Sequence, residues 1–189
     1  LPLILVMGGS QGAMSINDFI LDNLPAILQV TQVLHQTGLK NYQQTLKEVS
    51  FIAEKMPEEI AKRYKAVDYF GDEIKEAYIA SDLVVSRASA GAIFEIAAFG
   101  KPSILIPLPP NVAASDHQTK NAYDYTAAGA GEVIEQTNLL PNLFVSHVKR
   151  IVGDETVFSK MSATALEFAK PEAASKIAQI IVELGGNAA

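Results

Sequence analysis

The sequence has no cysteine, no long basic run and no apolar run long enough to cross a bilayer. Without cysteine, disulfides, thiolate metal sites and thiol catalysis are excluded, which is consistent with a cytoplasmic protein. A spanning helix needs about 20 consecutive apolar residues, so a transmembrane protein is also disfavoured. The net charge of −6 argues against DNA or RNA as the main partner.

The 189 residues are 49% hydrophobic and 19% charged, a composition that suits one domain with a substantial core. The sequence shows no internal repeat, no low-complexity linker and no signal-type segment at its start. It begins at Leu1, directly before a strand pattern, and we therefore expect a fragment of a longer protein.

Short apolar segments alternate with segments of helical periodicity. Strands are expected at residues 3–6, 31–35, 67–70, 83–85, 103–106 and 132–134, and helices at 15–28, 42–49, 57–64, 73–80, 90–99 and 118–128. From residue 138 the pattern is a helical tail in three pieces, broken near Gly153 and Pro171. This alternation predicts an α/β fold, a six-stranded parallel sheet with helices on both faces. Ligands of such sheets bind at the carboxyl ends of the strands, near the switch point.

A glycine-rich loop, GGSQGA at residues 8–13, joins the first strand to the first helix. Backbone N–H groups and the positive end of a helix dipole favour a phosphate there. The loop matches neither the dinucleotide motif nor the P-loop, and His35 and Gln36 stand where a NAD site would have an acidic residue. NAD binding is therefore disfavoured, whereas the residues of this loop fit both a phosphate-binding site and a tight turn without a ligand.

Three further loops follow expected strands. A lone histidine such as His35 is more often structural than a ligand. Phe70 either packs in the core or stacks on a base, and Arg87 is either a salt-bridge partner or a phosphate neighbour. Glu95 either faces solvent or accepts two hydrogen bonds from a ribose diol.

A proline-rich loop at residues 107–110 leads to a polar cluster at residues 115–121. An N-cap at Ser115 or Asp116 explains part of that cluster. It does not explain Gln118 and Asn121, which lie three apart on one helical face and can bind sugar hydroxyls.

The motifs GGSQGA, HQTG, SRASAGAIFEIAAFGKPSILIP and DHQTKNA, in this order, resemble the C-terminal half of the MurG family of bacterial UDP-GlcNAc transferases. The resemblance runs from about residue 3 to residue 135. It implies that residues 1–189 are a Rossmann-like donor-binding domain, the C-terminal half of a GT-B glycosyltransferase whose N-terminal acceptor domain is not in this chain.

Members of that family add GlcNAc to undecaprenyl-diphospho-muramoyl-pentapeptide, converting lipid I to lipid II in peptidoglycan synthesis. The resemblance therefore implies an inverting hexosyltransferase that needs neither a metal nor a cofactor. It also implies a peripheral location at the cytoplasmic face of the cell membrane, with UDP-GlcNAc and lipid I as partners and no nucleic acid. We expect the general base in the other half, and no catalytic residue is assigned in this chain.

The same resemblance assigns donor-binding residues by position. They are Gly9, Ser10, Gln11 and Gly12 at the diphosphate; Phe70 and Gly71 at uracil; Ala90, Gly91 and Ala92 at the phosphate and ribose; Glu95 at the ribose hydroxyls; and His117, Gln118 and Asn121 at the GlcNAc or its phosphate end. The family commonly has SRAGAxT, and this chain has Ser89 and Ala92 in place of its glycine and threonine. Backbone N–H groups would then replace one hydroxyl contact to phosphate.

Two other functions fit the same motifs. The chain could be a stand-alone donor-binding subunit that works with a separate acceptor subunit, or a non-catalytic nucleotide-sugar-binding module. A relative of the UDP-GlcNAc epimerases is disfavoured, because that chemistry needs more acid and base groups than these loops offer.

Overall fold

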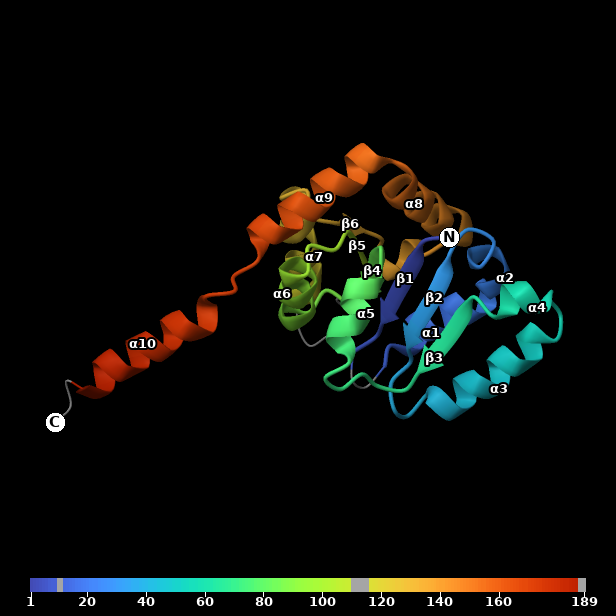
Figure 1. Cartoon of the computed structure of the whole chain (residues 1–189), viewed down its shortest axis with the longest axis horizontal. Helices are drawn as coiled ribbons and strands as arrows, with labels where there is room; N and C mark the ends of the chain where they lie inside the picture. The colour runs from blue at the N-terminus through green and yellow to red at the C-terminus, as the bar shows by residue number, and fades with distance from the viewer. Residues whose placement is uncertain (10–11, 110–115, 187–189) are drawn as a thin grey trace.

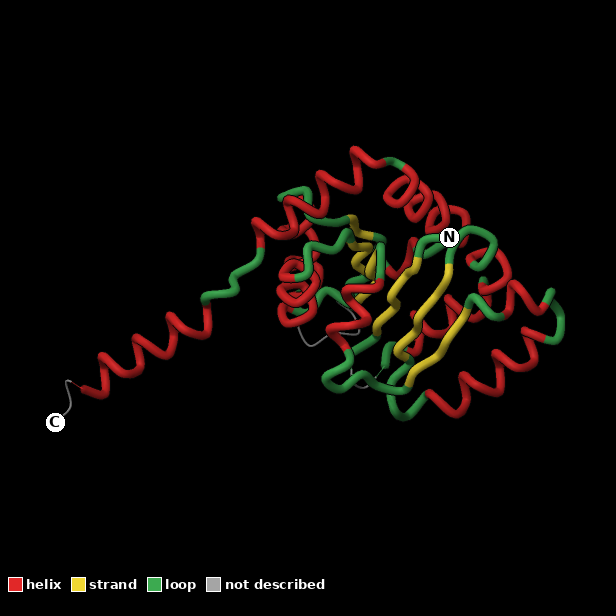
Figure 2. The backbone as a smooth tube through the Cα atoms, in the orientation of Figure 1, coloured by secondary structure: helices red, strands yellow, loops and turns green. Residues whose placement is uncertain are grey.

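A computed structural model describes residues 1–9, 12–109 and 116–186. Six strands within these residues form one sheet in the order β3-β2-β1-β4-β5-β6, and every neighbouring pair is parallel. Figures 1 and 2 show the strands at the centre of the domain. They are β1 (Leu3–Met7), β2 (Gln32–Gln36), β3 (Tyr64–Val67), β4 (Leu83–Ser86), β5 (Ser103–Leu105) and β6 (Glu132–Val133). The predicted parallel sheet is confirmed.

Helices connect the strands and follow the last one. They are α1 (Met14–Asp22), α2 (Leu24–Ile27), α3 (Tyr42–Ala53), α4 (Glu58–Ala61), α5 (Ile74–Ala80), α6 (Ala90–Ala98), α7 (His117–Ala127), α8 (Pro141–Gly153), α9 (Glu155–Phe168) and α10 (Ala173–Gly186), with a 3-10 turn at Gln136–Asn138. The helical run expected at residues 15–28 divides at Asn23. Pro25 lies in the first turn of α2, where its missing N–H has no helical partner to lose.

The alternation of side chains along β1 divides the core into two layers. Ile4 and Val6 lie in one layer with residues of α1, α2 and α8. Leu5 and Met7 lie in the other layer with residues of α5, α6 and α7. Successive side chains of a strand point to opposite faces, so helices cover both faces of the sheet, as predicted.

The third strand lies three residues earlier than the sequence indicated. It runs over Tyr64–Val67, and Tyr64 pairs with Val33 and Val67 with Gln36. The prediction of a strand at 67–70 was therefore wrong, as was the extension of the preceding helix to residue 64. Tyr64 is fixed in the sheet because its hydroxyl contacts the buried His35 ring, 2.9 Å from Nδ1. The earlier end of β3 places Phe70 in the loop that follows the strand.

The C-terminal helices differ in their packing. Phe144, Val148 and Ile151 of α8 and Ala165 of α9 are buried in the core. By contrast, α10 extends away from the body of the domain in Figure 1, and its apolar side chains are exposed. No helix in the described part of the chain is long and apolar enough to traverse a bilayer.

Candidate functional site

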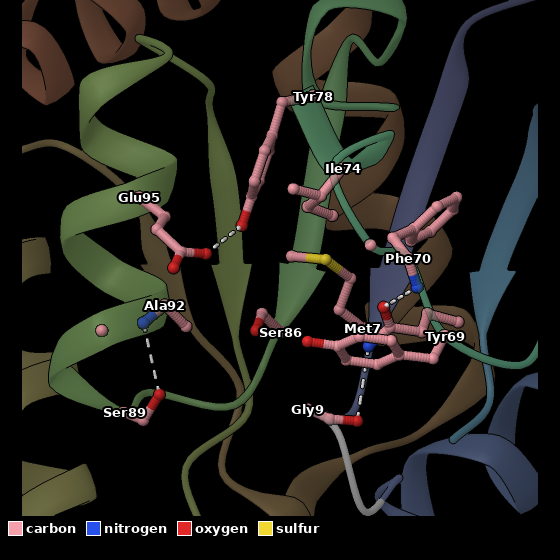
Figure 3. A pocket seen from close by; sticks show the side chains of 13 residues that line it. Met7, Gly9, Tyr69, Phe70, Ile74, Tyr78, Ser86, Ser89, Ala92 and Glu95 are labelled. Atoms are coloured by element: carbon pink, nitrogen blue, oxygen red, sulfur yellow. Dashed lines mark hydrogen bonds between the residues drawn. The ribbon is translucent and has the colours of Figure 1, made fainter. Parts of the chain in front are cut away.

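A pocket of about 340 Å³ lies at the carboxyl ends of β1, β2 and β4. β1 and β4 are neighbours, and the sheet continues from them in opposite directions, to β2 and β3 on one side and β5 and β6 on the other. This reversal of strand order is the place where open α/β sheets bind ligands. Among the described residues, the pocket is lined by Met7, Gly9, Gln36, Tyr69, Phe70, Gly71, Ile74, Tyr78, Ser86, Ser89, Gly91, Ala92 and Glu95 (Figure 3).

The glycine loop borders one side of this pocket through Gly9. Gly9 and Gly12 both have positive φ, 79° and 75°, a conformation that L side chains rarely adopt. The Gly12 N–H donates to the Gly9 carbonyl at 3.0 Å, so that amide already has a partner. A Cβ on Gly12 would lie 2.2 Å from the Thr37 carbonyl oxygen. Gly12 therefore serves a tight turn, while Ser10 and Gln11 lie outside the described residues.

The N-terminus of α6 forms another side of the pocket. Ser89 caps this helix, and its Oγ accepts from the Ala92 amide at 3.3 Å. Gly91 and Ala92 line the pocket near the positive end of the helix dipole, a position that favours an anion. One turn further along, Glu95 reaches the same pocket, and its Oε2 accepts from the Tyr78 hydroxyl at 3.3 Å (Figure 3).

A buried glutamine joins two of the loops around the pocket. Gln36, the last residue of β2, is 4% exposed. Its Oε1 accepts from the Phe70 amide at 3.0 Å, and its Nε2 lies 3.4 Å from the Gly9 carbonyl oxygen. The Phe70 N–H is therefore already paired with a side chain of the protein.

The predicted residues of α7 do not line this pocket. Gln118 Oε1 accepts from the Leu108 amide at 3.0 Å, and Asn121 Nδ2 donates to the Ala88 carbonyl at 3.2 Å. Their shared helical face therefore holds the proline-rich loop and the loop that precedes α6. His117 is exposed at the first turn of α7.

Ala90 and Asn121 border a smaller hollow, of about 100 Å³, between α6, α7 and α9. Ser115 and Asp116 were the predicted N-caps of α7. Asp116 occupies the N-cap position, but its side chain makes no capping hydrogen bond with the described residues. Ser115 lies outside the described residues.

The buried His35 is structural, as expected. Its ring is fully buried, with Nδ1 2.9 Å from the Tyr64 hydroxyl and Nε2 3.0 Å from Asn17 Oδ1. Burial lowers the pKa of this histidine to about 3, so the ring is neutral at physiological pH. A neutral ring that accepts at Nδ1 and donates at Nε2 satisfies both contacts.

Arg87 has no salt bridge within the described residues. Its guanidinium donates to the carbonyl oxygens of Ile106 and Pro107 and to the side chains of Ser15 and Gln136. Arg87 thus connects the carboxyl end of β4 to the segment after β5 and, through Ser15, to the first turn of α1.

A family model described as the glycosyltransferase family 28 C-terminal domain matches residues 3–179. The chain belongs to this family. The resemblance found in the loop motifs is therefore confirmed at the level of the family.

Curated relatives of this family 28 domain extend the match. The chain is 34% identical over 186 residues to a UDP-N-acetylglucosamine–N-acetylmuramyl-(pentapeptide) pyrophosphoryl-undecaprenol N-acetylglucosamine transferase from Nitratidesulfovibrio vulgaris strain DP4, covering 96% of this chain and 47% of the relative. It is also 34% identical to the transferase of that name from Solibacter usitatus, with the same coverage. The chain thus spans about half the length of the curated relatives that it matches.

Solved structures share the fold of the family 28 domain. The crystal structure of Acinetobacter baumannii MurG superposes with a TM-score of 0.76 at 25% identity, over 96% of this chain and 52% of that one. A UDP-GlcNAc 2-epimerase from Neisseria meningitidis, bound to UDP-GlcNAc, gives a TM-score of 0.64 at 13% identity, over 96% of this chain and 44% of that one. At that identity, the epimerase shows a likeness of fold alone.

The fold brings six of the predicted residues together among the described lining residues of the pocket, namely Gly9, Phe70, Gly71, Gly91, Ala92 and Glu95. Met7, Gln36 and Ser86 were not among the predicted site residues, although each is the last residue of its strand. The rule that ligands lie at carboxyl ends of strands pointed to the loops at residues 35–38 and 86–92, which contain Gln36 and Ser86, and the same rule could have found Met7. Tyr78 had no such signal, because it reaches the pocket from the side of α5.

Proposed function

We propose that this family 28 domain binds UDP-GlcNAc and is the donor-binding half of an inverting, metal-independent transferase. That enzyme adds GlcNAc to undecaprenyl-diphospho-muramoyl-pentapeptide. The observation that carries the proposal is that Gly9, the loop of Phe70 and Gly71, and Glu95 all border one pocket. The names of the curated relatives state this substrate pair for proteins about twice as long as the chain.

Each wall of the pocket suits one part of a UDP-sugar. The N-terminus of α6 favours the anionic diphosphate. Glu95 offers a carboxylate that can accept from both ribose hydroxyls. The loop with Phe70 and Gly71 combines an aromatic side chain with backbone groups, which suits a pyrimidine. We assign Gly9, Ser10, Gln11 and Gly12 to the diphosphate and His117, Gln118 and Asn121 to the GlcNAc end.

In the proposed reaction a muramyl hydroxyl of the acceptor attacks the anomeric carbon of GlcNAc. The new glycosidic bond forms as the bond from that carbon to the diphosphate oxygen breaks, and the hydroxyl proton passes to a base in the other half of the enzyme. Negative charge then develops on the leaving UDP. Fixed N–H donors and helix N-termini stabilise such charge without reorganising.

The proposed independence from metal rests on the residues of the site. Glu95 is the only carboxylate among the described residues that line the pocket, and we assign it to the ribose hydroxyls. None of those lining residues is then left to supply the one or two carboxylates with which a magnesium-diphosphate site is usually held. We expect transfer activity of the complete enzyme to persist in excess EDTA. With this lipid acceptor, we propose that the complete enzyme acts at the cytoplasmic face of the membrane.

Calorimetric titration of the chain with UDP-GlcNAc, UDP and ADP tests the donor assignment. We expect UDP to bind more tightly than ADP. We expect Glu95→Ala to weaken UDP binding about tenfold to a hundredfold, since hydrogen bonds to a charged group contribute about 1.5–3 kcal/mol. Glu76→Ala removes an exposed carboxylate of α5 that does not line the pocket and serves as the matched control. Equal affinity for UDP and ADP, or equal behaviour of the two variants, would refute the assignment.

Gene context and a reconstitution experiment distinguish this proposal from the two alternatives, a stand-alone donor-binding subunit and a non-catalytic binding module. An in-frame N-terminal half in the gene indicates one long enzyme. When that half is supplied, we expect transfer of GlcNAc to a lipid-linked muramyl acceptor, and a chain that binds UDP-GlcNAc but never supports transfer would be a binding module.

A further inference from the structure

A tyrosine from outside the predicted site contacts the carboxylate at its centre. The Tyr78 hydroxyl donates to Glu95 Oε2 at 3.3 Å, and both residues line the pocket. In Figure 3 the Tyr78 side chain extends from α5 toward Glu95 on the neighbouring helix. Burial, and then the neighbouring Glu95 charge, raise the pKa of the Tyr78 hydroxyl above its usual range. Tyr78 therefore remains a hydrogen-bond donor at physiological pH.

The two partners differ in how firmly they are held. Tyr78 is 1% exposed, and its ring stacks on Phe99 with centroids 4.8 Å apart and an angle of 16°. Glu95 is exposed on the first turns of α6. A free glutamate side chain loses considerable rotamer entropy when it is ordered. A rigid donor that already orients one oxygen lowers the cost of ordering the carboxylate around a ligand.

We propose that Tyr78 is a positioning residue that orients the Glu95 carboxylate for a ribose diol and so sets the preference for ribonucleotide ligands. The inference rests on the proposed function, because it presumes that Glu95 binds ribose. A carboxylate has about four lone-pair directions on its two oxygens. Tyr78 takes one direction on Oε2, which leaves the other directions to accept from the 2′- and 3′-hydroxyls.

A purely structural role for the hydroxyl makes a different prediction. Buried tyrosine hydroxyls usually find a hydrogen-bond partner, and Glu95 could serve only that need. Removing the hydroxyl would then change the free energy of unfolding and affect all ligands of the pocket alike. The discriminating readout is therefore the ratio of affinities for two nucleotides that differ only in the ribose hydroxyls.

The experiment compares UDP with 2′,3′-dideoxy-UDP in calorimetric titrations of the wild type and of Tyr78→Phe, which keeps the ring and its stacking. We expect Tyr78→Phe to weaken UDP binding about three- to tenfold, which corresponds to about 0.7–1.4 kcal/mol, and to leave dideoxy-UDP binding within twofold. In a Glu95→Ala background, Tyr78→Phe should have no further effect on UDP.

Tyr125→Phe is the matched control. Tyr125 is fully buried in the same layer of the core, but it does not line the pocket. Tyr125→Phe also removes one buried tyrosine hydroxyl, and it should leave the ratio of the affinities for UDP and dideoxy-UDP unchanged.

The outcomes separate this inference from the proposed function. If the wild type prefers UDP to dideoxy-UDP through Glu95 but Tyr78→Phe keeps that preference, the positioning role is refuted and the donor site stands. Equal losses for both nucleotides also refute it and assign the hydroxyl to structure. If the wild type binds UDP no better than ADP or dideoxy-UDP, the donor assignment fails and the inference fails with it.

Discussion

Acid should destabilise this fold through one buried histidine. His35 connects the sheet to α1, because its two ring nitrogens contact the Tyr64 hydroxyl and Asn17 Oδ1. Asn17 in turn donates to the Thr37 carbonyl at 2.9 Å, next to the glycine loop. A protonated ring would carry hydrogen on both nitrogens and could no longer accept from Tyr64. Protonation therefore costs both burial of a charge and one hydrogen bond.

The size of the effect follows from linkage. Burial lowers the pKa of His35 from the usual 6.5 to about 3, so the unfolded chain takes up a proton that the folded protein does not. Stability from this group is fully present above pH 6.5 and is lost as the pH falls toward about 3. Each pH unit in that window costs about 1.4 kcal/mol. Between pH 6.5 and 5, the free energy of unfolding should therefore fall by about 2 kcal/mol.

Urea unfolding at constant ionic strength, at several pH values from about 7.5 to about 5, measures this slope. We expect His35→Gln to be less stable than the wild type at the highest pH, with the difference shrinking by about 2 kcal/mol as the pH reaches 5. His117→Gln, which alters an exposed histidine, should keep the slope of the wild type. A constant difference between the wild type and His35→Gln across this range would refute the reasoning.

Two further substitutions test how the loops are held. Gly12→Ala should lower the free energy of unfolding by about 2 kcal/mol or more in urea titrations, because Gly12 has a positive φ and an added Cβ would clash with the Thr37 carbonyl. Gly91→Ala is the control and should have a small effect, because a Cβ there meets no atom within 4 Å. Arg87→Met keeps the apolar part of the side chain but leaves two buried carbonyls without their donor, so we expect the free energy of unfolding to fall by about 2–4 kcal/mol. An unchanged urea midpoint would show that those hydrogen bonds are dispensable.

The sequence was most informative where the chain obeys local rules. The apolar strands and the helical periodicity gave the parallel sheet and its order of elements, because a residue's face in a strand or helix depends on near neighbours. The prediction missed where β3 begins. Residues 64–70 contain both Tyr64–Val67 and Tyr69–Phe70, and their β-propensity does not distinguish the two. Pairing with Val33 and contact with His35 decide in favour of the earlier segment.

The candidate site shows even more clearly which features follow from local sequence and which depend on tertiary contacts. Glycines at 9 and 12, the small residues before Glu95 and the helix that bears Glu95 are all readable in the chain, since positive φ and helix N-termini have local signatures. The hydrogen-bond partner of each side chain could not be predicted from the sequence. For Gln118 and Asn121, which we assign to the GlcNAc end, the sequence did not indicate that each side chain also contacts a backbone group of a neighbouring loop.

The sequence alone thus determined the class of fold and several of the loops that border the candidate site. The tertiary structure alone decided which residues meet there: Tyr78 reaches Glu95 across 17 positions, Gln36 reaches Phe70 across 34, and Arg87 reaches Ser15 across 72. These contacts depend on how helices pack against the sheet. Packing is set by the whole core and leaves no periodic signal in any single segment.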